Sequence, residues 1–408
     1  MRAPGSTLSP LGHRLFLTLW LASLAGYFGN AIQSVGAAWL MTALDGRADR
    51  VALVQTAVQL PIMLFALVGG AVADLYDRRR IMLAAQTGIA LASAMLAVMA
   101  WQGLVTPWLL LSLTFALGLG TAFYNPAAQA SLGATVPRPE LAGAASLHVL
   151  GFNVARTLGP AIGGALVAFG GAVAAFVCNA IFCLAAALTL ACWRLPARAA
   201  APARQRVHQA IAEGLRCVRD LPPLRAIVAR GLAFTLAGSA IWALMPLVAR
   251  DLTGGGAQAF GLLLAALGLG AVVGAALSHE VRRRFRHETI LRAASLVFGA
   301  ACLIVAARPG FASSFAVLVA GGAFWVQALS GFSVAAQMHA PGHAVGRVTA
   351  TSTTVVYGGM ALGAWLWGHV AEWTSLATAI AASGAAMVLV AAVGTVLPMP
   401  EQESEAAA

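Results

Sequence analysis

The chain has 408 residues, of which 60% are apolar and only 10% are charged. Because soluble domains carry about a quarter of their residues as charged side chains, this composition excludes an ordinary water-soluble protein. The formal net charge of +11 is carried by arginines that lie between apolar runs, so a basic nucleic-acid-binding face is excluded as well.

Apolar runs long enough to cross the hydrocarbon of a membrane, about 20 residues each, recur along the whole chain. In the first half they lie at 15–43, 51–73, 81–101, 106–124, 147–170 and 173–193. After a polar interval they lie at 231–249, 258–279, 289–307, 312–336, 347–369 and 374–397. A glycine-rich turn at 170–172 separates the fifth run from the sixth. We therefore expect an all-α membrane protein of about twelve helices.

Arginines are distributed unevenly over the connections between these runs. With twelve crossings, the triple arginine at 78–80 and the clusters at 194–230 and 282–292 fall on the same side as both termini. Few arginines fall on the other side: Arg47, Arg50, Arg250 and Arg308. Since positively charged connections stay in the cytoplasm, we expect a multi-pass protein of the bacterial inner membrane with both termini in the cytoplasm.

The two halves of the chain share one plan. A shift of 204 residues places the segment 70–80 over 274–284, and each begins with a glycine and ends with three arginines. The same shift aligns glycines in the fifth span of each half, namely Gly159 and Gly164 over Gly363 and Gly368. Parallel repeats of this kind are a transporter plan in which substrate is held between the halves. We expect two pseudo-symmetric six-helix bundles, at 1–193 and 231–397.

The segment 194–230 joins the two bundles and is rich in arginine, alanine and proline. Apolar residues recur at helical spacing within 203–220, with arginines elsewhere, which is typical of a helix lying on a membrane surface. An ordinary basic linker explains the same residues equally well. The last stretch, 398–408, is expected to be an acidic tail.

The connection between spans two and three carries a family motif. Gly70-x-x-x-Asp74 followed by Arg78-Arg79 resembles the signature of the major facilitator superfamily at this place, and departs from it at Leu75. The resemblance implies that these four motif residues form a gating latch. A charge-assisted contact between Asp74 and Arg78 would form when the cytoplasmic side closes and break when it opens. The alternative is that the arginines only orient the loop.

Span five carries a second motif. The run 155–164 is similar to the span-five signature common in exporters of this superfamily. Together with Asn153 ahead of it and the run 33–42 in span one, it resembles the branch that contains the enterobactin exporter, the transmembrane secretion effectors. The resemblance covers essentially the whole chain and implies the major facilitator fold.

Proline and glycine in the fifth span of each half suggest a hinge. Proline removes a backbone donor and can kink a helix, while glycine lets helices approach closely. A tightly packed hinge is therefore expected where the two halves meet. Its residues are Gly159, Pro160, Gly163, Gly164, Gly359 and Gly363.

Arg156 is the one ionisable residue well inside an expected span, and no acidic residue lies deep in any of them. An ionisable residue in a span is by default a functional hypothesis; the alternative is that Arg156 binds carbonyls freed at Pro160. Further candidates for substrate binding or coupling are Asn153, Asn30, Gln33, Tyr124, Trp242, Trp325 and Gln327. Other polar residues within spans are Ser34, Gln55, Gln59 and Tyr357. Each one alone is also explained by packing or by a hydrogen bond between helices.

Enzyme classes find no support. The chain has no glycine-rich phosphate loop ending in lysine and no cluster with metal-ligand spacing, so neither a cofactor nor a metal is expected. We expect a secondary transporter that exports small organic compounds by alternating access, is coupled to protons, and works as a monomer in the lipid bilayer. The alternatives are a siderophore exporter and, from another class, a membrane receptor or assembly factor that uses a transporter fold without transport.

Overall fold

The computed structural model describes residues 8–192, 215–341, 345–396 and 399, without the side chain of Asp74. All regular structure in these ranges is helical, so the all-α prediction is confirmed. The long helices of the first half are α1 (Arg14–Leu44), α2 (Ala48–Leu75), α3 (Arg78–Trp101), α4 (Pro107–Ser131) and α5 (Leu141–Cys192). Those of the second half are α7 (Pro222–Leu247), α8 (Ala257–Arg284), α9 (His287–Ala306), α10 (Phe311–His339), α11 (Val345–Trp373) and α12 (Leu376–Val396). Short helical turns are η1 (Ser9–Gly12), η2 (Leu132–Ala134), η3 (Arg138–Glu140) and η4 (Val248–Leu252).

Helix α5 is a hairpin of two membrane-length arms. Its 52 residues would extend roughly 78 Å as one straight helix, far beyond a hydrocarbon core of about 30 Å. The backbone turns at Gly171, whose φ of 68° is one that only glycine adopts readily. Both arms then pack at one level of α1: a methyl group added at Gly163 would lie 3.1 Å from Val35, and one added at Gly36 would lie 2.7 Å from Ala175.

Long apolar helices dominate the described chain. Ten of them are long and apolar enough to cross a membrane. One of the ten contains both arms of α5, and α11, with 29 residues, is a further long helix outside the ten. Counting each arm of α5 and adding α11 gives twelve crossings, which favours the number expected from the sequence.

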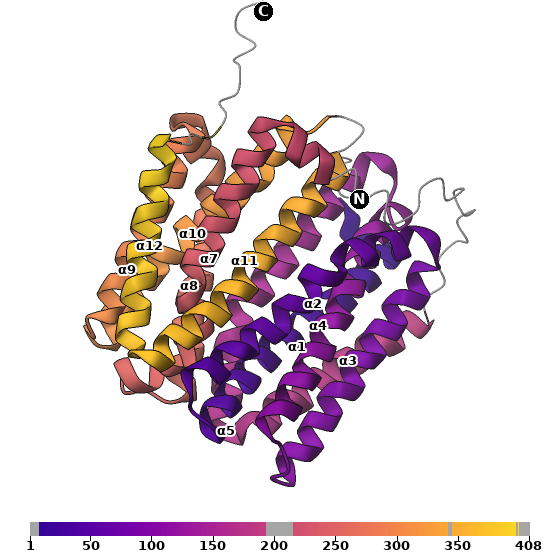
Figure 1. Ribbon diagram of the computed structural model, residues 1–408. Helices are drawn as coiled ribbons and strands as arrows, with labels where there is room; N and C mark the ends of the chain where they lie inside the picture. The colour runs from indigo at the N-terminus through magenta and orange to yellow at the C-terminus, as the bar shows by residue number, and fades with distance from the viewer. Residues whose placement is uncertain (1–7, 193–214, 342–344, 397–398, 400–408) are drawn as a thin grey trace, which may run out of the picture.

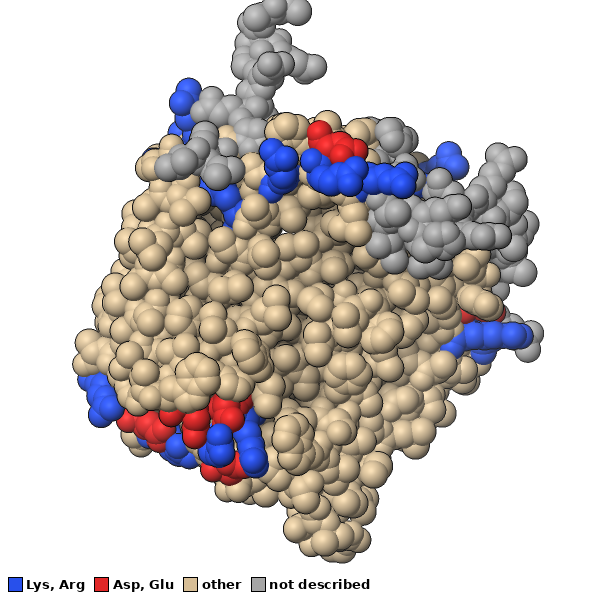
Figure 2. All heavy atoms as spheres, viewed as in Figure 1, with Lys and Arg blue, Asp and Glu red and all other residues tan. Residues whose placement is uncertain are grey.

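The outer surface of the helices is apolar. Large side chains that face outward include Leu91, Ile181, Leu188 and Leu389, exposed by 58% to 66%. A water-soluble monomer rarely exposes apolar surface on this scale. Figure 2 shows charged side chains gathered at the edges of one face, with a broad uncharged band between them. The chain is a multi-pass membrane protein, and this band is the part that lipid covers.

The two halves form bundles that meet along two seams, α2 against α11 and α5 against α8 (Figure 1). The packing repeats with the sequence shift of 204. Gly159 of α5 packs against α1 through Ala31, and its counterpart Gly363 of α11 packs against α7 through Ser239. Likewise Gly164 meets α8 and its counterpart Gly368 meets α2. Corresponding glycines therefore contact corresponding helices in the two halves.

The second bundle begins earlier than the expected boundary at 231, because α7 starts at Pro222. Proline is favoured in the first turn of a helix, where its missing N–H is not needed. This places Arg230 inside α7, where only 4% of its side chain is exposed and it pairs with Glu288 of α9. Arg230 thus lies within a helix, near the level at which α9 begins. Most of the predicted helix 203–220 lies outside the described residues, although 215–220 is helical.

Candidate substrate-binding cavity

A cavity of about 450 Å³ lies between the two bundles. Its wall comes from α1, α2, α4 and α5 of the first half and from α7, α8, α10 and α11 of the second. The volume is in the range of pockets that hold drug-sized molecules. Because both halves contribute, any relative movement of the bundles changes the shape of the cavity.

The cavity is closed at one end of the molecule, the distal end, which is formed by the connections 45–47, 102–106, 253–256, 307–310 and 374–375. There Glu372 of α11 accepts a hydrogen bond from the backbone N–H of Ala48, at 3.1 Å, and pairs with Arg47 at 3.4 Å. Arg250 donates to the carbonyl of Thr42 at 3.4 Å. These contacts all join the first half to the second, so the distal end is shut.

Towards the other end, which carries the chain termini, the wall continues almost to the helix ends. The lining reaches Ala336 on α10, which ends at His339, and Thr349 on α11, which begins at Val345. In the middle of the helices, one hydrogen bond crosses each seam. Thr56 donates to the carbonyl of Ala361 at 3.1 Å, and Thr157 donates to the carbonyl of Gly268 at 3.0 Å. The cavity therefore extends from a closed distal end towards the end with the termini.

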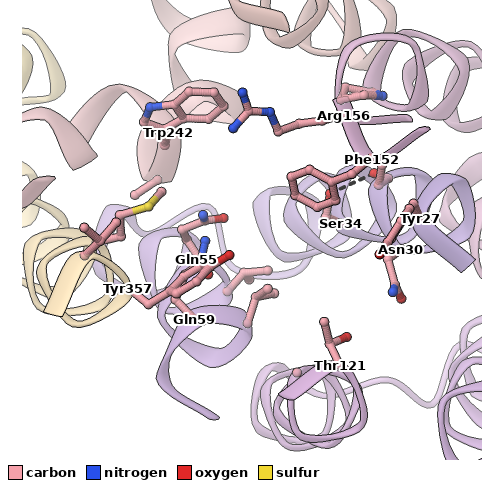
Figure 3. A pocket seen from close by; sticks show the side chains of 18 of the residues that line it. Tyr27, Asn30, Ser34, Gln55, Gln59, Thr121, Phe152, Arg156, Trp242 and Tyr357 are labelled. Atoms are coloured by element: carbon pink, nitrogen blue, oxygen red, sulfur yellow. Dashed lines mark hydrogen bonds between the residues drawn. The ribbon is translucent and has the colours of Figure 1, made fainter. Parts of the chain in front are cut away.

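Arg156 projects into the cavity from the middle of the first arm of α5 (Figure 3). Its guanidinium carbon lies 6.0 Å from the centre of the Phe152 ring, one turn earlier on the same helix. Tyr357 of α11 lines the same cavity. In Figure 3 the Arg156 side chain extends in the direction of Trp242 on α7. A positive charge therefore stands between aromatic side chains of both halves.

Aromatic rings form much of the wall on the side of the second half. Trp325 of α10 is only 2% exposed, and its ring centre lies 4.8 Å from that of Phe298 and 5.0 Å from that of Phe234. Trp242 lies next to it at 5.8 Å. Because Trp325 is held on several sides, it supports Trp242, whose ring is more accessible from the cavity.

Several buried polar atoms of the lining have no hydrogen-bond partner among the residues that the structure describes. They are Gln33 Nε2, Gln59 Oε1, Thr114 Oγ1, Asn125 Oδ1, Trp242 Nε1 and Ser352 Oγ. Buried polar atoms are normally satisfied. A group of unsatisfied atoms around one cavity is typical of a site that binds a polar ligand or ordered water.

Five of the residues predicted for substrate binding lie together in this cavity: Asn30, Gln33, Arg156, Trp242 and Trp325. Three others do not line it. Tyr124 is buried and bonded to Ser23 at 2.9 Å, and Gln327 donates to the carbonyl of Gly274 at 2.8 Å. Asn153 lies just outside the lining, with its carbonyl accepting from Thr157. Hydrogen bonds to neighbouring helices thus account for Tyr124 and Gln327.

The cavity also contains residues that the sequence did not single out, namely Tyr27, Thr121, Asn125 and Phe152. Helices α2 and α11 contribute Gln55, Gln59 and Tyr357. The two glutamines lie four residues apart and so share one face of α2. That spacing is the one sequence signal that indicated a polar wall on this helix.

The predicted latch residues lie at the end with the termini. Arg78 donates to the carbonyls of Ala73 and Ala130, at 3.1 and 2.6 Å. Arg79 donates to the carbonyl of Leu190 at 2.8 Å. These contacts stay within the first half. Gly70 has no atom within 4 Å of an added methyl group, and the side chain of Asp74 lies outside the description.

The predicted hinge residues divide between two kinds of contact. At the seam with α8, a methyl group added at Gly164 would lie 2.6 Å from the Cα of Gly261, and one added at Gly261 would lie 2.7 Å from the carbonyl oxygen of Pro160. The remaining hinge residues pack within their own half, Gly159 and Gly163 against α1, and Gly359 and Gly363 against α7.

Comparison with known proteins adds a family and a fold. Residues 5–408 match the family described as transmembrane secretion effector, a branch of the major facilitator superfamily. The multidrug efflux pump Tap of Mycolicibacterium fortuitum is 30% identical over 94% of this chain and 95% of its own length. The staphyloferrin A transporter of Staphylococcus aureus is 23% identical, over 68% and 70%. A bacterial homologue of the human lysosomal transporter Spinster, solved in an inward-facing, unoccupied conformation, superposes with a TM-score of 0.71 at 16% identity, over 94% of each chain.

Proposed function

Because this chain belongs to the transmembrane secretion effector family of the major facilitator superfamily, we propose that it exports small organic compounds by alternating access, with protons as the driving ion. The observation that carries the proposal is the cavity between the halves, which is shut at the distal end by contacts between the two bundles. A site held between two bundles becomes accessible from alternate sides when the bundles rock about their seams.

The uneven distribution of arginines supports an orientation with the termini in the cytoplasm of a bacterial cell. In that orientation the cavity faces the cytoplasm, as required to load a compound that will be exported. The fold is shared with a transporter solved in an inward-facing state. Binding of substrate would then favour closure of the cytoplasmic side and opening of the distal end.

Transport into everted membrane vesicles tests the proposal directly. Vesicles that contain the chain should accumulate compounds from a panel of antibiotics and dyes when their interior is made acidic, and lose them when an uncoupler is added. Vesicles from the same strain without the chain are the control. Accumulation that survives collapse of both the pH gradient and the membrane potential would contradict proton coupling. No accumulation of any compound by folded protein would contradict export.

Siderophore export is a second candidate. Arg156 in the cavity suits a ligand with anionic metal-binding groups, and one relative is a staphyloferrin A transporter. Competition separates the two candidates: an iron-free carboxylate or catecholate siderophore should block dye accumulation if it uses the same cavity. A siderophore that is neither accumulated nor competes would eliminate this candidate and leave drug export standing.

A further inference from the structure

The charge of the cavity wall is of one sign. Arg156 is the only charged residue among the described side chains that line the cavity, and none of the lining residues is acidic. The Arg156 side chain is partly buried, so its charge is screened less by water than the charge of an arginine on an open surface. The cavity therefore presents a positive potential to any molecule that enters it.

The guanidinium of Arg156 makes few contacts with other described residues of the protein. Within the described chain, the structure gives it no hydrogen bond and no ion pair, only the ring of Phe152 at 6.0 Å. By contrast, Arg230 pairs with Glu288 and Arg79 donates to the carbonyl of Leu190. Keeping an unpaired guanidinium in a span is costly, which a purely structural role leaves unexplained.

The strongest hydrogen-bond donors at the site carry no acceptor atom. A guanidinium carries five N–H donors and an indole carries one, and neither has an acceptor atom. Figure 3 shows Arg156 extending from α5 towards the ring of Trp242 on α7, whose indole nitrogen lies on the far side of the ring from Arg156. Gln33 Nε2 is a further donor without a partner. A ligand that satisfies these groups must bring acceptor oxygens.

The walls next to these donors are flat and apolar. Phe152, Trp242 and Tyr357 line the cavity beside Arg156, and Phe260 stacks near the distal end against Trp39, with ring centres 6.5 Å apart. Aromatic faces favour contact with a planar ring. The cavity thus combines a positive donor set with surfaces suited to a conjugated plane.

We propose that the substrates are organic anions whose acidic group, a carboxylate, sulfonate or catecholate, is attached to an aromatic or conjugated ring. Arg156 binds the acidic group, and the aromatic walls, Trp242 among them, bind the ring. A lipophilic cation finds no carboxylate in the described wall and meets a like charge at its centre. The proposal rests on the proposed export function and defines the charge of its substrate.

A matched pair of fluorescent probes isolates the contribution of charge. Anilinonaphthalenesulfonate is an anion, and N-phenylnaphthylamine has the same ring skeleton without the sulfonate. Tetraphenylphosphonium supplies a lipophilic cation. Binding of each is measured to purified protein in lipid nanodiscs, with empty nanodiscs subtracted. The variants are Arg156→Gln, which removes the charge, and Arg156→Lys, which keeps it without the planar fork. Arg225→Gln is the matched control, because Arg225 is exposed on α7 and does not line the cavity.

The parent protein should bind the anion more tightly than its neutral counterpart and bind the cation most weakly. Arg156→Gln should weaken anion binding by about 10- to 100-fold, as expected for loss of a charge-assisted hydrogen bond, and change neutral binding by less than about twofold. Arg156→Lys should retain part of the preference, and Arg225→Gln should retain all of it.

Two results would overturn the proposal: equal or tighter binding of the cation by the parent, or an anion affinity that Arg156→Gln leaves unchanged in protein with a normal elution profile. Everted vesicles separate this failure from failure of the proposed function. If the neutral or cationic probe is accumulated and the anion is not, export stands and the substrate class is wrong. If no probe and no compound of the antibiotic panel is accumulated, export itself is wrong.

Discussion

Glu372→Gln should loosen the closed distal end. Glu372 lies at the end of α11, and its carboxylate accepts from the N–H of Ala48, the first residue of α2. One half of the protein thus caps a helix of the other half. The amide of glutamine keeps a weaker acceptor and loses the negative charge that the N-terminus of a helix favours.

The expected magnitude follows from these contacts. Weakening the capping hydrogen bond costs at most about 1 kcal/mol, the cost of losing a capping group, and loss of a charge near a helix N-terminus costs about 0.5 kcal/mol at a partly exposed site. The ion pair with Arg47 adds little, because the arginine side chain is 49% exposed and surface pairs are weak. A total of at most about 1.5 kcal/mol would raise the population with an open distal end by up to roughly tenfold relative to the closed one.

Pulsed electron–electron double resonance between two spin labels measures this shift in the population of the open distal end. Labels at Gln102→Cys and Ser313→Cys, both exposed near the distal end, report the separation of the two halves in a background without the five native cysteines. Glu280→Gln is the matched control, because Glu280 pairs with Arg284 of the same helix at the other end. An unchanged distance distribution in Glu372→Gln would refute the role of this cap in holding the distal end closed.

Two further outcomes concern the seams and the buried ion pair. Gly164→Leu should insert normally and lose most of its transport in vesicles, because the seam leaves no room for a side chain there. Gly88→Leu is the control and should transport at the parent rate, because a methyl group added at Gly88 has no atom within 4 Å. Equal transport rates for the two variants would show that the seam tolerates separation. Arg230→Gln should lower the melting temperature by a few degrees, because the partly buried Glu288 loses one of its two charged partners and keeps Arg292. Arg225→Gln should not lower it, and equal melting temperatures for the two variants would contradict this reason.

The architecture was largely predictable because membrane crossing imposes a length and a polarity that a sequence displays directly. The glycine-rich stretch at 170–172 indicated a turn, and the positive φ of Gly171 provides it. The start of α7 at Pro222 was missed, because a span defined by continuous apolar residues stops at the first charges. Arg230 can continue the helix since Glu288 of another helix neutralises it. Such a partner, distant in the chain, leaves no mark in local composition.

The site was predictable only in part. Arg156 stood out because a charge in a span has few explanations. Tyr124 and Gln327 have the same polarity as Asn30 and Gln33, yet their hydrogen bonds go to Ser23 and the carbonyl of Gly274. Whether a polar side chain faces a neighbouring helix or a cavity depends on the rotation and spacing of helices, which the sequence of one helix does not contain. The coupling ion and the latch stay predictions.

The contact between Gly164 and Gly261 has a mechanical consequence. At that point of the seam two backbones touch, and neither helix carries a side chain that could interlock with the other. Ordinary helix pairs place ridges of side chains in grooves, so sliding them requires rotamers to change in step. Where two glycines meet, one helix can rotate against the other without any rotamer change at the point of contact. We infer that at this point the halves of the protein can turn against one another with little rearrangement of side chains.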